Sequence, residues 1–444
     1  MMNGDSLKSV AIIGAGITGL TAAYELAKRG LRVEVFEAHA EVGGELAVID
    51  VGGTPVERYY HHLFRGDHHM IELMRELGID SSLEWNTPRM GFFAGGSLYP
   101  FTTPLDLLQF KPLPFRSRIQ MGLATMRLRR IQDYHDLEDI PAAEYLPPMV
   151  GNEAFEILWK PLLRAKFGDS WPEISMAWFW GRVHVRFKSR TRSGLRELLG
   201  YVNGSFRTIT RALETRAKAL GVVFHLKTPV SSIQVVNDRA TGLIVDGQKR
   251  DFDYVLATVG LPLLRRFLGD VELSRDIGAV EYRGALVMLM QLRQRVSRFY
   301  WTNVGDEAIP FAGLIEHTNF IAPEVYGGAH LLYVSNYVPA SDRLFNLTDS
   351  ELFDEYAPHI ERVFPDFKRD LVEEFWVSKD PVAQPVIKTG YQRRIPDFRS
   401  PIAGLYICNT SQIYPEDRGT NYNVRIARQA VELLCEEAGL TNSE

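Results

Sequence analysis

One stretch decides the fold of this chain: Val10-Ala11-Ile12-Ile13-Gly14-Ala15-Gly16-Ile17-Thr18-Gly19. Its four apolar residues predict a buried strand, and a helical pattern from Leu20 to Ala27 follows the three glycines. Gly14 permits a tight turn, Gly16 lets the backbone approach a pyrophosphate, and Gly19 lets the helix pack closely on the sheet. A strand, a glycine turn and a helix in this order predict a dinucleotide site at a helix N-terminus.

An acidic residue and a second glycine pair support this prediction. The strand from Arg32 to Phe36 ends at Glu37, where a carboxylate would bind ribose hydroxyls and would repel the 2′-phosphate of NADP. Gly43 and Gly44 follow, where the chain would pass along the diphosphate and ribityl arm of a flavin. The combination favours FAD over NAD, with Thr18 as a further contact. The alternative is an ordinary glycine turn beside an unrelated acid.

Length and composition indicate a large globular protein. The chain has 444 residues, of which 45% are hydrophobic, so it exceeds the usual size of one domain. A net charge of -5 gives no general attraction to nucleic acid. Two cysteines are too few for a disulfide framework, so we expect a reducing, cytoplasmic compartment. We expect no secretory signal and no bilayer-spanning segment, because no apolar run reaches about 18 residues.

The signals of the dinucleotide domain return twice along the chain. Ile209 to Leu220 is a predicted helix followed by several strands, and Gly404 to Asn409 is a predicted strand before a loop and a helix from about 422 to 438. We therefore predict an α/β fold with a Rossmann-like, glutathione-reductase-like FAD-binding domain and a discontinuous α+β substrate domain on a mixed sheet. The FAD-binding domain is expected from residues 1–55, 199–267 and 397–444, and the substrate domain from residues 56–198 and 268–396.

Together these motifs resemble the flavoprotein superfamily of amine oxidases, protoporphyrinogen oxidase, phytoene desaturases and UDP-galactopyranose mutase. The resemblance covers nearly the whole chain and includes the Asn203-Gly204 turn before a helix. It implies that Val230 contacts the adenine through its backbone and that the segment 414–423 crosses the flavin. The cofactor contacts that it implies in the carboxy-terminal part are Asn409, Asp417, Arg418, Gly419, Thr420 and Asn421.

Two positions depart from the superfamily pattern. Glu45 follows the second glycine pair, where a basic or polar residue is common. Asn409 ends the last strand, where an Asp is common. Its amide still offers hydrogen bonds to a ribityl hydroxyl or a phosphate without charge repulsion, so the flavin assignment stands.

Four of the eleven histidines lie between His61 and His69. The resemblance implies that this segment approaches the isoalloxazine ring. His61 or His62 is then the candidate catalytic group that handles a proton or contacts substrate, with Tyr60 as a substrate contact. The alternatives are a packed domain junction for His61 and His62, and a solvated helix start for His68 and His69. The spacing matches no standard ligand pattern, so no metal is expected.

Aromatic and cationic residues gather between Trp159 and Arg186. Trp and Arg together stack on a ring and bind an anion, so Trp180 and Arg182 are candidate substrate contacts. A sugar nucleotide or a lipid carrying a phosphate would use both. The alternative is that the tryptophans are core residues of a helical subdomain. His317 and Tyr391 complete the candidate substrate site, and for His317 a satisfied core histidine is the favoured alternative.

The segment 107–132 is cationic and contains no acid. Apolar residues separate its cations, as on an amphipathic surface that rests on an anionic membrane leaflet. The alternative, which is favoured, is a basic helix that covers the substrate domain. The six cations are Lys111, Arg116, Arg118, Arg127, Arg129 and Arg130.

The predicted function is that of an FAD-dependent oxidoreductase. It would dehydrogenate or desaturate a sizeable small-molecule or lipid-like substrate by hydride transfer to flavin, for an electron acceptor that the sequence does not identify. The main alternative is a UDP-galactopyranose mutase-like isomerase, in which reduced flavin attacks a sugar nucleotide without net oxidation. A non-catalytic flavoprotein module is disfavoured by the many ionisable and aromatic groups of the substrate domain.

Overall fold

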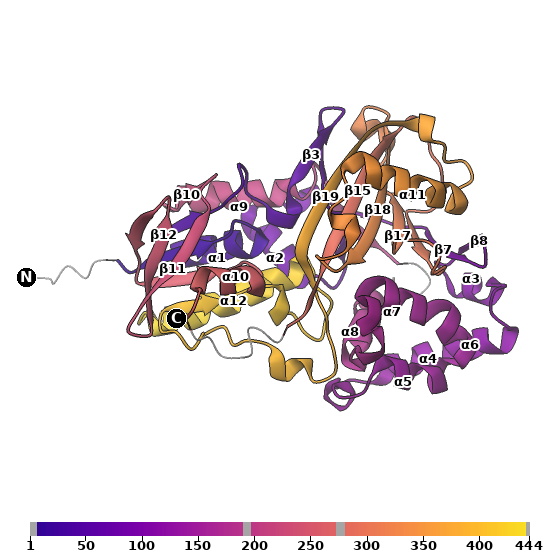
Figure 1. Ribbon diagram of the computed structural model, residues 1–444, viewed down its shortest axis with the longest axis horizontal. Helices are drawn as coiled ribbons and strands as arrows, with labels where there is room; N and C mark the ends of the chain where they lie inside the picture. The colour runs from indigo at the N-terminus through magenta and orange to yellow at the C-terminus, as the bar shows by residue number, and fades with distance from the viewer. Residues whose placement is uncertain (1–6, 190–196, 272–279, 441–444) are drawn as a thin grey trace, which may run out of the picture.

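A five-stranded parallel sheet forms the centre of one half of the molecule (Figure 1). The computed structural model describes residues 7–189, 197–271 and 280–440. In spatial order the strands are Val223–His225 (β10), Arg32–Phe36 (β2), Ser9–Ile13 (β1), Tyr254–Ala257 (β14) and Leu405–Ile407 (β20). Each neighbouring pair is parallel. This topology confirms the predicted Rossmann-like fold, and its strands come from all three blocks of the predicted FAD-binding domain.

Alternate residues of β1 face different layers. Val10 and Ile12 pack into a core shared with one layer of helices, whereas Ala11 and Ile13 pack toward a three-stranded antiparallel sheet. Because successive side chains of a strand point to opposite faces, a strand that is apolar throughout is covered on both sides. The helices are Ile17–Lys28 (α1), Arg207–Ala219 (α9) and Thr420–Glu437 (α12), and the antiparallel strands are Val230–Val236 (β11), Arg239–Val245 (β12) and Gln248–Asp251 (β13).

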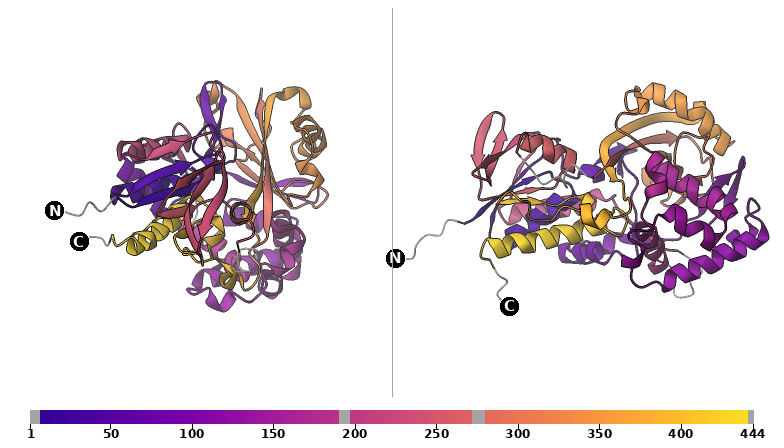
Figure 2. Two further views of the ribbon diagram at one scale, coloured as in Figure 1. Left: turned by 60° about the vertical axis from the view of Figure 1, so that its left-hand side comes forward. Right: turned by 60° about the horizontal axis from the view of Figure 1, so that its bottom comes forward.

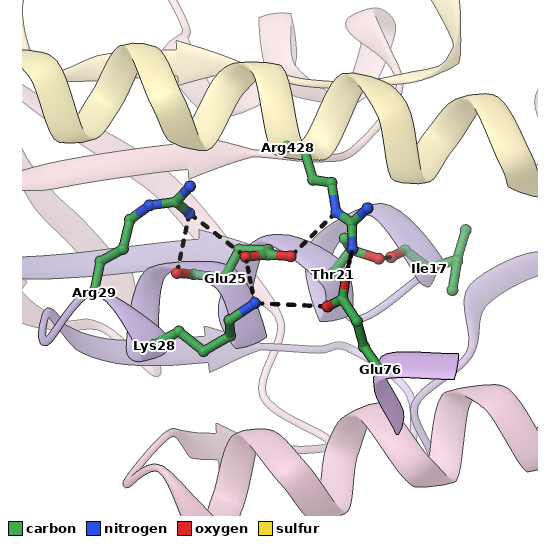
Figure 3. Close-up of polar contacts among 7 residues, drawn as sticks. All are labelled: Ile17, Thr21, Glu25, Lys28, Arg29, Glu76 and Arg428. Carbon is green, nitrogen blue, oxygen red and sulfur yellow. Dashed lines mark hydrogen bonds and ion pairs between the residues drawn. The ribbon is translucent and has the colours of Figure 1, made fainter. Parts of the chain in front are cut away.

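An ion-pair network holds the helix layer together (Figure 3). Glu25 of α1 is buried, and its carboxylate pairs with Arg29 and with Arg428 of α12. The Arg428 Nε lies 3.1 Å from Glu25 Oε1, while its Nη2 lies 2.6 Å from Glu76 Oε1 on α2 (His68–Leu77). One guanidinium therefore joins three helices that are far apart in the sequence, which suits its several fixed donors.

A seven-stranded mixed sheet organises the other half of the molecule (Figure 2). Leu286 and Met288 pack on one of its faces against Tyr356 and Ile360 of α11 (Asp349–Val363). Only the pairing of β16 with β7 is parallel among the described neighbours of this sheet. In spatial order the strands are Val372–Pro385 (β19), Tyr282–Leu292 (β15), His330–Val338 (β18), Gly313–Glu316 (β17), Trp301–Val304 (β16), Met90–Ala94 (β7) and Ser97–Pro100 (β8).

A helical group lies beside the mixed sheet, and its helix α7 contacts β16 and β18. The group comprises Pro104–Gln109 (α3), Phe115–Arg130 (α4), Ala142–Val150 (α5), Asn152–Ala154 (α6), Lys160–Phe167 (α7) and Met176–Lys188 (α8). Two further elements are the hairpin of Val48–Val51 (β3) with Thr54–Glu57 (β4), and the helix Leu261–Leu268 (α10), which contacts β11.

One segment of the predicted substrate block packs on the cofactor half instead. The helix α2 contacts α12 and α9, and Leu73 and Met74 lie in the core on the helix side of the parallel sheet. A small antiparallel sheet adds to this junction, because Leu199–Val202 (β9) pairs with Leu63–Phe64 (β5) and with Leu83–Asn86 (β6). The residues from about 63 to 86 therefore pack mainly on the cofactor half, and β5 also contacts α8 of the helical group.

Candidate functional site

A cavity of about 1480 Å³ lies where the two halves of the molecule meet. On the side of the parallel sheet it is lined by the glycine turn, Glu37 and Val230. On the side of the mixed sheet and helices it is lined by residues such as Lys166 and Tyr337. Its volume exceeds the roughly 300–1,000 Å³ of a pocket for one small ligand, so it has room for a cofactor together with a substrate.

The two glycine groups lie against each other at this cavity. Gly43 N donates a hydrogen bond to Ala15 O at 2.8 Å, and Gly16 pairs with Gly43. Gly44 has φ of +58°, and a Cβ there would lie 3.1 Å from the Cα of Gly16. A Cβ on Gly19 would lie 2.0 Å from the carbonyl oxygen of Gly14. The glycines are therefore required by backbone packing as well as by the approach of a phosphate.

Glu37 lines the cavity and holds the glycine turn. Its Oε2 accepts a hydrogen bond from Ala15 N at 2.8 Å, and its Oε1 accepts one from His39 N at 2.9 Å. The side chain is largely buried at the end of β2. Because a carboxylate has about four acceptor positions, it retains the capacity to bind ribose hydroxyls. The residues present therefore fit an adenosine ribose and a diphosphate beside it.

The carboxy-terminal segment also lines the cavity. All six of its predicted cofactor contacts lie there: Asn409, Asp417, Arg418, Gly419, Thr420 and Asn421. Thr420 begins α12, so the unpaired N–H groups of an 18-residue helix face this region. The Asn409 Oδ1 caps a short turn at Ser411 N, and its buried Nδ2 has no hydrogen-bond partner among the described residues. The Asn421 side chain accepts a hydrogen bond from Met70 N at 3.1 Å.

Glu45, the departure noted in the sequence, is paired with a cation from the carboxy-terminal segment. Its Oε1 lies 2.6 Å from Nη1 of Arg418, whose Nε donates to Gln384 Oε1 at 3.1 Å. Burial alone would lower the pKa of Arg418, but Glu45 and Tyr337 hold that pKa well above its ordinary value. The cavity thus has a fixed positive charge opposite the acid that follows the glycine pair.

Asp417 is bound to the helical group. Its Oδ2 lies 2.6 Å from Lys166 Nζ and 2.5 Å from Arg182 Nη1, and its Oδ1 accepts a hydrogen bond from Trp178 Nε1 at 3.3 Å. Burial would raise the pKa of Asp417, but Lys166 and Arg182 hold it well below its ordinary value. The carboxylate therefore fixes two cations of α7 and α8 at the cavity, and Arg182 lines it as expected.

The histidine pair lies in the cavity wall. The His61 Nδ1 is 2.6 Å from Tyr59 O, and the His62 Nδ1 is 3.2 Å from Tyr300 Oη. Burial lowers the pKa of His61 to about 4 and, with the positive charge of Arg186, the pKa of His62 to about 3. Both imidazoles are therefore neutral at physiological pH. His68 and His69 begin α2, in agreement with the alternative prediction that they lie at the start of a helix.

Three predicted substrate contacts do not line this cavity. Trp180 donates from Nε1 to a backbone carbonyl at 3.0 Å and packs against His184. His317 is buried, with its Nε2 2.7 Å from Tyr326 Oη, in a short helical turn that begins directly after β17 ends at Glu316. Tyr391 is buried and donates to a backbone carbonyl at 2.9 Å. Internal hydrogen bonds thus satisfy all three side chains.

Sequence reasoning missed the hydroxyl groups of β18. Ser335 and Tyr337 line the cavity, and Tyr333 shares their face of the strand. The sequence signal for them was their spacing of two residues, which places side chains on the same face of a strand. Lys166 was also missed, because its role depends on a partner, Asp417, that lies 251 positions away. No group of three potential metal ligands is found within residues 7–189, 197–271 and 280–440.

Comparison with known proteins identifies the family. A family model described as flavin-containing amine oxidoreductase matches residues 17–416. The chain belongs to the flavin-containing amine oxidoreductase family. This membership confirms the predicted resemblance and gives flavin as the cofactor class.

Curated proteins that are similar to this chain include an oxidase and a desaturase. Coproporphyrinogen III oxidase of Staphylococcus aureus is 26% identical over 281 residues, which cover 56% of this chain and 60% of that protein. Phytoene desaturase of Fusarium fujikuroi is 23% identical over 389 residues, which cover 80% of this chain and 65% of that protein. The chain thus matches less than two thirds of the length of these curated relatives.

A solved structure of reduced UDP-galactopyranose mutase has the same fold. Its TM-score is 0.74 at 15% identity, over 98% of this chain and 96% of that chain. The fold alone therefore does not identify the reaction, which has to be argued from the site.

Proposed function

We propose that this chain is an FAD-dependent oxidoreductase that dehydrogenates or desaturates a sizeable organic substrate by hydride transfer to flavin. The observation that carries this proposal is a single cavity lined by the glycine turn, by Glu37 and by side chains of the mixed sheet. Bound FAD supplies a two-electron acceptor for hydride. The proposal includes the division into an FAD-binding domain of residues 1–55, 199–267 and 397–444 and a substrate domain of residues 56–198 and 268–396.

FAD fits the residues better than a flavin mononucleotide. Glu37 and Val230 line a part of the cavity that is suited to an adenosine, which the mononucleotide lacks. The glycine turn and the N-terminus of α12 would bind the diphosphate and the pyrimidine edge of the flavin. We assign His61 and His62 as contacts of substrate or flavin, and their neutral rings favour recognition over proton storage.

A sugar-nucleotide isomerase is the second candidate. The two cations that Asp417 holds at the cavity, Lys166 and Arg182, are suited to an anionic group such as a diphosphate. Coproporphyrinogen and phytoene, which relatives oxidise or desaturate by name, represent the first candidate. The two proposals differ in whether oxidised flavin gains electrons from the substrate.

Anaerobic mixing of the purified protein with a substrate panel tests this choice. The panel contains coproporphyrinogen III, protoporphyrinogen IX, phytoene in detergent and UDP-galactopyranose. The oxidoreductase proposal expects one of the first three to bleach the oxidised flavin with formation of the dehydrogenated product. Conversion of the sugar nucleotide only by pre-reduced enzyme, with no net change in the flavin spectrum, would favour the isomerase. Gly16→Val, which places a side chain at the expected diphosphate site, serves as the cofactor-free control.

We also propose a cytoplasmic location with peripheral contact to an anionic membrane through α3 and α4. On α4 the residues Met121 and Leu128 face the protein core, whereas Phe115 and Leu123 are 65% and 53% exposed. The exposed apolar residues recur at helical spacing and are flanked by the cations of segment 107–132. No helix of the described ranges is long and apolar enough to cross a bilayer.

Vesicle co-sedimentation tests the membrane proposal. We expect binding to vesicles of phosphatidylcholine with phosphatidylglycerol, and less binding to phosphatidylcholine alone or at high salt. A Leu123→Ser, Met126→Ser double variant should lose this binding. Val236→Ser, at a side chain that is 48% exposed elsewhere, is the matched control. Equal sedimentation of wild type and double variant would contradict the proposal.

A further inference from the structure

Three hydroxyl groups meet on the wall of the cavity that the mixed sheet forms. Ser335 and Tyr337 belong to β18, and Tyr60 comes from the loop before β5. The Tyr60 Oη lies 2.8 Å from Ser335 Oγ and 3.5 Å from Tyr337 Oη. All three residues line the cavity, so the chain of hydroxyls is accessible from the space where a substrate would lie.

Two fixed cations flank the Tyr337 ring. The Lys166 Nζ lies 5.4 Å and the Arg418 Cζ 5.9 Å from its centroid. Asp417 holds the first cation and Glu45 holds the second, so neither depends on the substrate for its position. The Tyr337 backbone is anchored as well, because its carbonyl oxygen accepts hydrogen bonds from Arg283 at 3.1 Å and 2.6 Å.

This environment makes the Tyr337 phenol more acidic. Burial would raise its pKa, but Arg418, Lys166 and the hydrogen bond with Tyr60 hold the pKa below its ordinary value. Burial instead raises the pKa of Tyr60 well above its ordinary value. The geometry agrees with this difference, because both cations lie beside the ring of Tyr337. The groups beside the Tyr337 side chain are Tyr60 of the loop, Lys166 of α7 and Arg418 of the carboxy-terminal segment. Ser335 contacts Tyr60, Asp417 pairs with Lys166 and Glu45 pairs with Arg418, whereas Arg283 of β15 binds the Tyr337 backbone carbonyl.

We propose that Tyr337 is the proton acceptor of this cavity, which rests on the proposed hydride-transfer function. Bound FAD would accept the hydrogen and both electrons of one substrate C–H bond, and Tyr337 would act in its deprotonated, phenolate form. A bond from the neighbouring substrate atom to hydrogen breaks, its electron pair forms the new double bond, and its proton goes to the Tyr337 oxygen. The substrate thus loses one hydride, which carries two electrons, and one proton. Tyr60 and Ser335 then offer a path by which the phenol passes the proton on.

The other basic groups of the cavity are less suited to this role. His61 and His62 have pKa values of about 4 and about 3, so each is a weak base at physiological pH. Burial lowers the pKa of Lys166, but Asp417 opposes this shift because its carboxylate is paired with the ammonium. A base is most effective when its pKa lies close to the working pH, and Tyr337 is displaced toward it from above.

Near-ultraviolet titration of the FAD-loaded protein tests the assignment without a substrate. Wild type minus Tyr337→Phe should show the ionisation of one phenol below the pH of about 10 at which ordinary tyrosines titrate. Lys166→Met should move that ionisation to higher pH, because one of the two cations is lost. Tyr282→Phe on β15 is the matched control, since burial raises the pKa of Tyr282 to about 12. An early ionisation that persists unchanged in Tyr337→Phe would overturn the proposal.

Anaerobic flavin reduction by coproporphyrinogen III provides the kinetic readout. Its rate should rise with pH as Tyr337 ionises, and Tyr337→Phe should lower it by about a hundredfold or more while retaining FAD. A wild-type rate and pH profile in Tyr337→Phe would refute the role. Absence of reduction in wild type, with the titration as expected, would count against the proposed substrate and leave the acid–base assignment supported by the titration. Loss of FAD from wild type would instead contradict the proposed function.

Discussion

Glu37 combines two tasks at one carboxylate. It accepts hydrogen bonds from Ala15 N and His39 N, which shapes the glycine turn, and it lines the cavity where a ribose would lie. We expect Glu37→Ala to lose most of its FAD, because a hydrogen bond to a charged acceptor contributes about 1.5–3 kcal/mol. The measurement is FAD content after purification and affinity by recovery of flavin fluorescence. Glu37→Gln keeps one acceptor oxygen and should retain more FAD; full occupancy in Glu37→Ala would contradict the assignment.

Substitution of His61 or His62 distinguishes a role in substrate recognition from a role in proton transfer. Since both rings are neutral above about pH 4, their substitution should not move a pH optimum between pH 5 and 8. We expect His62→Phe to retain its fold and FAD and to weaken substrate binding while the reaction of bound substrate is largely retained. Single-turnover rates at several substrate concentrations separate the two effects. A loss confined to the rate of bound substrate, with a shifted pH profile, would make His62 the proton-handling group.

At the scale of elements, Arg428 joins α12 to α1 and α2. Arg428→Met should destabilise the protein by about 1–3 kcal/mol, because Glu25 is buried and loses one of its charged partners. Thermal unfolding followed by circular dichroism measures this. Arg399→Met, which removes a pair whose arginine is 48% exposed, is the control and should change stability by at most about 1 kcal/mol. Equal effects of the two substitutions would show that the buried network adds nothing.

The elements around the glycine turn were predictable because their signals are local. The apolar run of β1, the three glycines and Glu37 lie within 28 residues and leave few alternatives. The position of α2 was not predictable. An apolar stripe indicates that one face of a helix is buried, but it does not indicate against which layer of the fold that face packs. The contacts of Asp417 were not predictable either. Its expected cofactor role came from the family resemblance alone, whereas its ion pairs involve residues of α7 and α8 that are distant in the sequence.

At the scale of the whole molecule, Glu57 links the halves and makes stability depend on pH. Its carboxyl group contacts Phe206 N and Tyr201 Oη on the cofactor half, and its backbone carbonyl accepts a hydrogen bond from Tyr333 Oη of β18 at 2.6 Å. Burial raises the pKa of the carboxyl group from 4.5 to about 7. The folded protein therefore keeps a proton that the unfolded chain loses, so this contribution is complete below pH 4.5 and falls as pH rises through 7. Glu57→Gln should flatten the decline in unfolding free energy between pH 5 and 8, by at most about 3 kcal/mol. Denaturant unfolding at both pH values measures this, and an unchanged decline would contradict it.

The cavity between the halves could be predicted only in part. The cofactor side follows from sequence motifs, whereas the substrate side combines Lys166, Tyr337 and Asp417 from three distant segments. His317 shows that a histidine alone does not indicate a functional site, because its ring forms a hydrogen bond with Tyr326 inside the core. Specific substrate contacts depend on the packing of both halves, which local sequence patterns do not encode.

The most direct test of the central claim is a crystal structure of the purified yellow protein with its bound cofactor. We expect one FAD in the cavity, with its adenosine ribose on Glu37, its diphosphate at Gly14 and Gly16, and its isoalloxazine ring beside Arg418 and Gly419. The substrate side of the ring should face Tyr337. A ring bound beside Glu37, with the adenosine beside Arg418, would contradict the account, as would a cofactor bound outside this cavity.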